Sequence, residues 1–124
     1  MSLHHILLID DDLAMRTVLK DILEDAGYMV TTAEDGASAI EKINENNFDL
    51  VITDLRMPNM DGMEFLDYIE RNRPELKVMV VTAFGRDKYK EAKMLGAFEF
   101  LSKAVRIEEL KKVVENIINR TEKT

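Results

Sequence analysis

Five short segments typical of strands, separated by stretches with helical spacing, constrain the fold of this chain more than any other feature. The first, Ile6-Leu7-Leu8-Ile9, is continuous and ends in an aspartate, as expected of a strand buried on both faces. The other four span residues 29–33, 50–53, 78–81 and 98–101. Since right-handed crossovers place each helix over the sheet, five repeats of strand then helix predict a parallel sheet with helices on both faces.

Apolar residues recur at helical spacing after the predicted strands. After the first strand they form one predicted face, made of Met15, Val18, Leu19, Ile22, Leu23 and Ala26. Gly27 then stands where a helix C-terminus favours a residue with positive φ. Residues 86–95 have helical composition but a thin apolar face, so we expect that helix to be the most loosely held.

Length and charge limit the classes of function. The 124 residues, 46% hydrophobic and 33% charged, fit one domain over 1–124 with one core. A net charge of -7 argues against direct nucleic-acid binding, so we expect any role at DNA to come through a partner or another domain. No cysteine is present for disulfides or thiolate chemistry. Since no apolar run approaches the roughly 20 residues of a membrane span, we expect a cytoplasmic protein without membrane contact.

Polar residues stand where four of the five predicted strands end. Three aspartates, residues 10–12, follow the first strand, and Asp54 follows the third. Thr82 and Lys103 follow the fourth and the fifth. Because sites in open parallel sheets form beyond the carboxyl ends of the strands, we expect these side chains to meet in one crevice.

This set of side chains suits a divalent cation and a phosphoryl group. Asp10, Asp11 and Asp54 would repel one another without a cation, and hard carboxylate oxygens without His or Cys favour Mg²⁺. Such a site leaves coordination positions for phosphate oxygens. Lys103 adds a positive charge and Thr82 a hydroxyl donor, so the crevice would combine an acceptor, a metal and two groups for phosphoryl oxygens.

Four motifs in this order carry a resemblance: Leu8-Ile9-Asp10-Asp11-Asp12, residues 53–62 (Thr-Asp-Leu-Arg-Met-Pro-Asn-Met-Asp-Gly), Val81-Thr82-Ala83 and Ser102-Lys103. Together they resemble the receiver domains of two-component response regulators, over nearly the whole chain. The resemblance implies an α/β, flavodoxin-like fold: a doubly wound five-stranded parallel sheet in the order 2-1-3-4-5 with five helices. It also implies a signalling domain that assists its own phosphotransfer and slow autodephosphorylation, rather than an enzyme.

The resemblance further implies a role for each matching residue of the site. Asp54 would accept the phosphoryl group from a sensor histidine kinase or a histidine phosphotransfer protein. Asp11 and Asp54 would bind Mg²⁺ directly, with the backbone carbonyl of Arg56, and Asp10 would act mainly through a metal-bound water. Lys103 would pair with the phosphoryl group.

The same resemblance implies a conformational switch. Thr82 would move toward a phosphoryl oxygen, which lets the aromatic ring of Phe100 turn inward. Because residues 86–95 offer little apolar surface to hold their helix in place, we expect the face formed by the fourth helix, the fifth strand and the fifth helix to change with it and to bind a second copy of the chain or another partner. Arg56 and Phe84, two residues beyond Asp54 and Thr82, would modulate the rate of dephosphorylation.

One position departs from the pattern, because receivers usually follow the lysine with a cis proline and this chain has Ala104. A cis bond before a residue other than proline costs about 2.5 to 4 kcal/mol, so we expect a trans bond. That change affects the aim of Lys103 and the path of the loop after it. It does not affect the identity of the acceptor.

Two alternative functions stay open. A phosphohydrolase of the haloacid-dehalogenase type would use Asp10 as nucleophile and Asp12 as its partner, but Ala14 departs from that motif and no cap domain fits. A degenerate receiver would lack the acceptor or the acid pair, and both are present. The identity of the phosphorylated aspartate distinguishes a receiver, which would use Asp54, from the hydrolase, which would use Asp10. For Asp12 we expect a structural role as the N-cap of the first helix.

Overall fold

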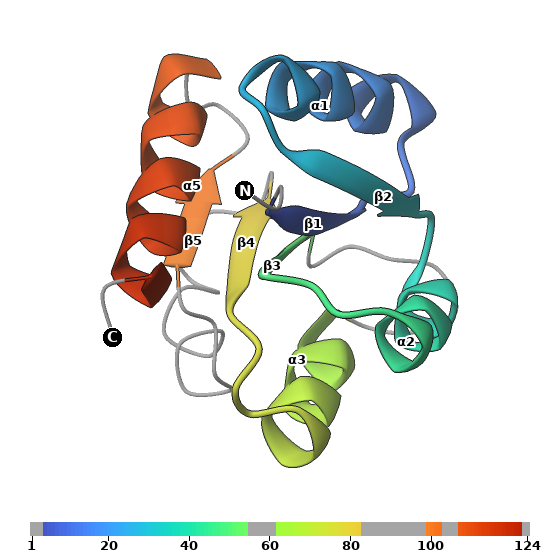
Figure 1. Ribbon diagram of the computed structural model, residues 1–124. Coiled ribbons are helices and arrows are strands. Elements are labelled where there is room, and N and C mark those ends of the chain that lie inside the picture. The colour runs from blue at the N-terminus through green and yellow to red at the C-terminus, as the bar shows by residue number, and fades with distance from the viewer. Residues whose placement is uncertain (1–3, 55–61, 83–98, 103–106, 123–124) are drawn as a thin grey trace.

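A parallel five-stranded sheet forms the centre of the computed structural model, which describes residues 4–54, 62–82, 99–102 and 107–122 (Figure 1). Its strands are β1 (His5–Ile9), β2 (Met29–Ala33), β3 (Leu50–Thr53), β4 (Val78–Thr82) and β5 (Glu99–Ser102). They lie in the order β2-β1-β3-β4-β5, which makes β3 the central strand.

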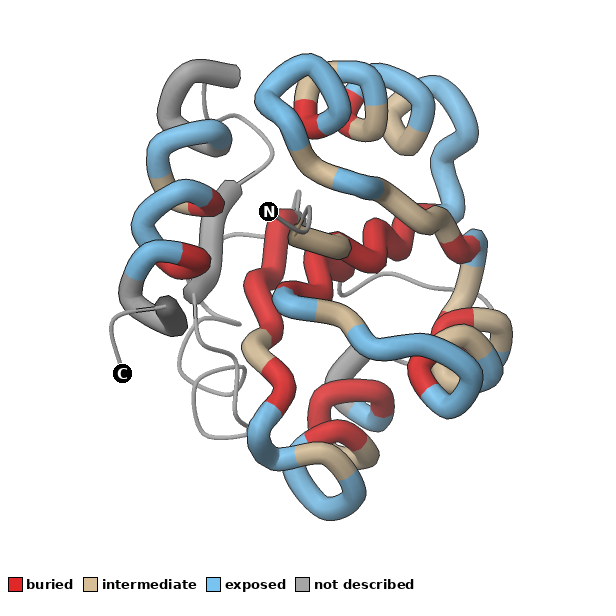
Figure 2. The backbone as a smooth tube through the Cα atoms, viewed as in Figure 1, coloured by how far each residue is buried: buried red, intermediate tan, exposed pale blue. Residues whose placement is uncertain are grey.

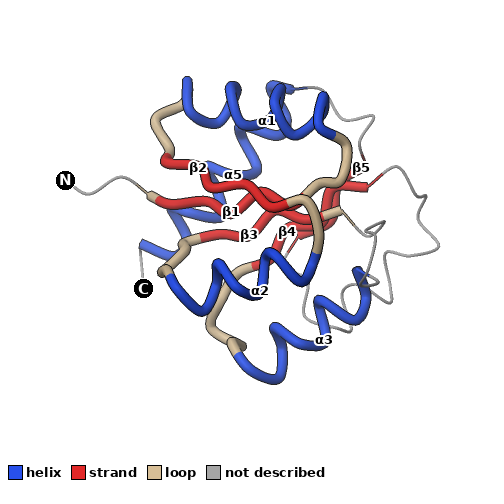
Figure 3. The backbone as a smooth tube through the Cα atoms, turned by 90° about the vertical axis from the view of Figure 1, so that its right-hand side faces the viewer, coloured by secondary structure: helices blue, strands red, loops and turns tan. Residues whose placement is uncertain are grey.

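Helices cover both faces of this sheet. Helices α1 (Leu13–Asp25) and α5 (Ile107–Glu122) lie on one face, and α2 (Gly36–Glu45) and α3 (Gly62–Asn72) lie on the other (Figure 3). The predicted parallel sheet with helices on both faces is therefore confirmed. The described residues hold four helices rather than the expected five, because the helix predicted over 86–95 lies outside them.

The sheet divides the core into two clusters of buried side chains. Alternate residues of β1 face opposite ways, so that Leu7 and Ile9 pack toward α2 and α3 while Ile6 and Leu8 pack toward α1 and α5. In Figure 2 the buried strands lie in the middle and the exposed residues lie mainly on the outer sides of the helices. Strands buried on both faces explain the continuous apolar runs in the sequence.

Local signals fix the two ends of α1. The Asp12 side chain accepts hydrogen bonds from the backbone N–H groups of Ala14 and Met15, at 3.0 and 3.3 Å, which confirms it as the N-cap. Gly27 has φ of 101°, as predicted from its place after the helix. The chain can therefore turn at once into β2.

Two details of the predicted elements were wrong. Val18 is 49% exposed and Ala26 is exposed, because the buried stripe of α1 is narrower than the apolar pattern suggested and Ala26 lies past the last helical residue. The bounds of three strands also differ by one residue: the first begins at His5, and the fourth and fifth extend to Thr82 and Ser102.

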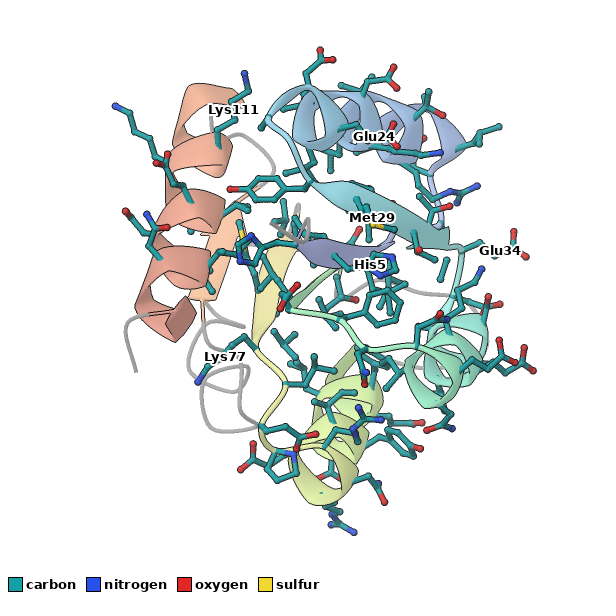
Figure 4. The ribbon with its side chains drawn as sticks, in the orientation of Figure 1. His5, Glu24, Met29, Glu34, Lys77 and Lys111 are labelled. Atoms are coloured by element: carbon teal, nitrogen blue, oxygen red, sulfur yellow. The ribbon has the colours of Figure 1, made fainter. Side chains whose placement is uncertain are left out.

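A side-chain cluster lies at the start of β1, at the end of the sheet opposite the aspartates. The His5 ring, labelled in Figure 4, lies 2.6 Å from the Thr31 hydroxyl through Nε2, and its centroid is 4.5 Å from that of Phe48. The Asp49 carboxylate accepts a 2.8 Å bond from the His5 backbone N–H. These contacts tie β1 to β2 and to the start of β3.

No helix in the described ranges is long and apolar enough to cross a membrane.

Candidate metal centre

The pairing of β1 with β3 places Asp10 beside Asp54. Ile9 lies opposite Thr53 in the parallel register, so the next residue of each strand is an aspartate at the same edge of the sheet. The backbone N–H of Asp54 donates a 3.3 Å hydrogen bond to the Ile9 carbonyl. The predicted meeting of these two carboxylates at the strand ends follows from this register.

Hydrogen bonds to Ala33, Asp12 and Arg16 help to hold the backbone and side chain of Asp10. Its backbone N–H donates to the Ala33 carbonyl at 3.1 Å, and its Oδ1 accepts from the Asp12 backbone N–H at 2.9 Å. Its carbonyl accepts a 2.6 Å bond from Nη1 of Arg16. With 2% of its surface exposed, Asp10 is a buried carboxylate in a fixed place.

Asp54 is also buried, with 4% of its surface exposed, at the carboxyl end of the central strand. The Thr53 hydroxyl donates a 3.0 Å hydrogen bond to the Asp54 carbonyl. The backbone of this residue is therefore held on both sides, by Ile9 through its N–H and by Thr53 through its carbonyl. A carboxylate held in this way is suited to present one oxygen to an incoming group.

Asp10, Asp11 and Asp54 form one cluster of carboxylates. One oxygen from each lies within 4.8 Å of the other two, and Asp11 is the exposed member. Hard oxygen ligands at this spacing fit a divalent cation such as Mg²⁺, which keeps several waters and needs few protein ligands. Such a cation would also relieve the repulsion between three negative charges.

The remaining predicted site residues are placed only in part. Thr82 is the last residue of β4 and pairs with Ser102 in the register, so its backbone lies at the same edge of the sheet as the aspartates. Phe100 lies opposite Val80. The predictions for Arg56, Phe84, Lys103 and Ala104 concern residues outside the described ranges, as do those for the side chains of Thr82 and Phe100.

Sequence reasoning missed the contributions of Arg16 and Thr53. Each donates a side-chain hydrogen bond to the backbone carbonyl of a buried aspartate, Asp10 and Asp54 respectively. Bonds of this kind leave no motif. One signal in the sequence could have indicated the role of Arg16: it is a positive charge close to the start of α1, where the helix dipole disfavours one.

The position of Asp12 bears on the hydrolase alternative, which requires Asp12 to act beside Asp10. In the structure its Oδ1 caps α1, and the carboxylate that joins Asp10 and Asp11 is that of Asp54. The geometry therefore favours Asp54 as the third acidic group of the site.

Comparison with known proteins gives a consistent result. The family model described as response regulator receiver domain matches residues 6–115. The transcriptional regulatory protein ZraR of Klebsiella oxytoca is 37% identical over 117 residues, which cover 94% of this chain and 26% of that protein. The chain thus spans about a quarter of the length of the curated relatives it matches.

Two solved structures are similar over most of this chain. A CheY-like response regulator receiver domain protein from Methanospirillum hungatei has a TM-score of 0.93 and 31% identity, with 98% of both chains covered. The response regulator TrrA from Thermotoga maritima, solved in complex with Mg²⁺ and BeF, has a TM-score of 0.86 and 32% identity, with 93% of this chain and 99% of that chain covered.

Proposed function

The chain belongs to the response-regulator receiver family of two-component signalling, and on that premise we propose that Asp54 is its phosphoacceptor. The observation that carries the proposal is the place of Asp54, buried at the end of the central strand with its carboxylate within 4.8 Å of those of Asp10 and Asp11. Receiver domains of response regulators work with histidine kinases. The donor is accordingly a phosphohistidine of a sensor kinase or of a histidine phosphotransfer protein.

In the proposed reaction a carboxylate oxygen of Asp54 attacks the phosphorus. The new O–P bond forms as the N–P bond of the phosphohistidine breaks, and the imidazole nitrogen keeps the bonding electron pair. Asp11, Asp54 and the Arg56 carbonyl would hold Mg²⁺, and Asp10 would act mainly through a metal-bound water. When bound, Mg²⁺ neutralises the acidic cluster and orients the phosphoryl oxygens.

Two further residues complete the proposed site. Lys103 pairs with a phosphoryl oxygen, and the Thr82 hydroxyl donates to another. None of the proposed site residues is a strong general base for water, so the acyl phosphate hydrolyses slowly, at a rate set partly by Arg56 and Phe84. The protein is therefore a signalling domain that slowly hydrolyses its own acyl phosphate.

The proposed output is a change of surface. Thr82, drawn to the phosphoryl group, leaves space into which the Phe100 ring turns, and the fourth helix, predicted over residues 86–95, shifts with it. The altered face, together with α5, binds a second copy of this chain or another partner.

We place residues 1–124 in one receiver domain that works in the cytoplasm without direct contact with membrane or nucleic acid. Several relatives are named as transcriptional regulators. With its net charge of -7, this chain would reach DNA only through another domain or a partner.

Phosphorylation with acetyl phosphate and Mg²⁺, followed by mass spectrometry of peptides, tests the proposed acceptor. We expect one acid-stable, base-labile phosphoryl group on Asp54, absent from Asp54→Asn, and beryllofluoride should occupy the same place. Labelling retained in Asp54→Asn would contradict the assignment, and a label on Asp10 would restore the hydrolase.

Amide hydrogen exchange with and without beryllofluoride tests the proposed output. We expect altered exchange within residues 84–106. Changes limited to α1 and α2 would place the output surface elsewhere.

A further inference from the structure

Arg16 bonds to both ends of the turn that carries the three aspartates. Its backbone N–H donates to the Asp12 carbonyl at 2.9 Å, as the first bond of α1. Its guanidinium Nη1 donates to the Asp10 carbonyl at 2.6 Å. One residue thus fixes the carbonyl groups on either side of Asp11.

We propose that Arg16 is a positioning residue for the divalent cation. It holds the turn over residues 10–12 in the shape that keeps the Asp11 carboxylate near Asp10 and Asp54. Asp11 is the exposed member of the cluster, and the described structure gives its side chain no hydrogen bond of its own. Its place therefore depends on the backbone around it. This inference rests on the proposed function.

Two features of this contact favour a positioning role over simple charge compensation. The bond goes to a backbone carbonyl rather than to a carboxylate, so it does not occupy an oxygen that could bind the metal. Arg16 also lies near the start of α1, where the helix dipole disfavours a cation. A residue that breaks a local preference in this way is expected to have a compensating role.

The two roles predict effects of opposite sign on Mg²⁺ affinity. If Arg16 acted only through its charge, removing it would raise the affinity, because a positive charge beside the site repels the incoming cation. If it positions the turn, removing it lowers the affinity. Loss of partners that orient metal ligands typically weakens binding by about 10- to 100-fold. We expect the lower end, about tenfold, since Arg16 orients the backbone rather than a ligand atom.

The test is a Mg²⁺ titration of the full chain, monitored through amide chemical shifts. It compares the parent with Arg16→Met and Arg16→Lys. Arg16→Met keeps the length of the side chain but loses the charge and the donor, whereas Arg16→Lys keeps both in altered geometry. Arg71→Met is the matched control, because Arg71 is an exposed arginine in the last turn of α3 that pairs with Asp67 at 3.2 Å. It makes the same change in net charge away from the aspartates.

We expect affinity about tenfold lower in Arg16→Met, an intermediate value in Arg16→Lys, and the parent value in Arg71→Met. Labelling of Asp54 by acetyl phosphate should slow in Arg16→Met at low Mg²⁺ and recover as Mg²⁺ is raised. In the metal-free protein the Asp12 amide, bonded to Asp10 Oδ1, should exchange faster in Arg16→Met than in the parent.

The outcomes separate this inference from the proposed function. Unchanged or higher Mg²⁺ affinity in Arg16→Met, with the parent binding normally, overturns the positioning role alone. If Arg16→Met does not fold, parent affinity in Arg16→Lys together with an unchanged Asp12 amide overturns it. A parent chain that binds no Mg²⁺ overturns both.

Discussion

The backbone N–H of Asp54 donates a 3.3 Å hydrogen bond to the carbonyl of Ile9, the residue that directly precedes Asp10. The main chain of the proposed acceptor is therefore joined to the main chain of the acidic turn through one peptide group. A shift of either aspartate along its strand would strain this bond. The acceptor and the metal ligands are consequently placed by the same strand pairing, before any ligand binds.

Asp11→Asn should stabilise the metal-free protein. Two unit charges 4 Å apart repel by about 1 kcal/mol in water and about 4 kcal/mol at the dielectric typical of protein surfaces, so we expect a gain of about 1 to 3 kcal/mol in the free energy of unfolding. Mg²⁺ should raise the urea midpoint of the parent but have little effect on the variant. A metal-free Asp11→Asn protein less stable than the parent would show that repulsion is not the dominant effect.

Asp12→Ala should lower the free energy of unfolding by about 1 kcal/mol through loss of a helix cap. Asp35→Ala is the matched variant, because Asp35 caps α2 through a 2.8 Å bond from the Ser38 N–H and is not one of the three clustered carboxylates. We expect similar losses by urea unfolding, but only Asp12→Ala should also weaken Mg²⁺ binding. Equal Mg²⁺ affinity in the two variants would show that the helix cap formed by Asp12 does not contribute to metal binding.

Thr53→Val keeps the shape of a buried side chain and removes the hydroxyl that donates to the Asp54 carbonyl. We expect a loss of about 0.5 to 1.5 kcal/mol in the free energy of unfolding and slower labelling of Asp54. Thr31→Val is the control, because Thr31 makes its 2.6 Å contact with His5 on the edge strand β2. A labelling rate that Thr53→Val leaves at the parent value would restrict Thr53 to a structural role.

The turn between α3 and β4 should contribute a pH-dependent stability. A backbone hydrogen bond at Glu75 and the Arg73 guanidinium, 3.0 Å away, lower the pKa of the Glu75 carboxyl below 4.5. Since a lowered carboxyl pKa stabilises the folded state above the unfolded value, this contribution is present above pH 4.5 and is lost as pH falls through the folded pKa. Urea midpoints of the parent and Glu75→Gln should differ at neutral pH and converge in acid. Curves that stay parallel down to pH 3 would exclude the effect.

Strands and caps were readable from the sequence because each has a local chemical cause. A continuous apolar run such as that of residues 50–52 fits a strand buried on both faces, and Asp12 and Gly27 mark helix ends through their own side-chain and backbone preferences. The placement of Asp10 and Asp54 at one sheet edge followed from strand polarity alone.

The bonds that hold the site rigid could not be read in the same way. The contact of Arg16 with Asp10 and that of Thr53 with Asp54 depend on side-chain rotamers and on the pairing of strands far apart in the chain. Many arginines and threonines in similar positions have no such partner. The bond from Arg73 to the Ile43 carbonyl, which ties the end of α3 to α2, escaped prediction for the same reason.

The separation of the core into two clusters by the sheet has a consequence for how such a sequence can diverge. Side chains packed under α1 and α5 make their contacts on one side of the strands, and those under α2 and α3 on the other. Substitutions without shared neighbours have nearly additive effects on stability, so exchanges in one cluster need no compensation in the other. Exchanges among the side chains under α1 and α5 can therefore accumulate without matching changes under α2 and α3, although β3 packs against both clusters, through Leu50 and Ile52 on one side and Val51 on the other.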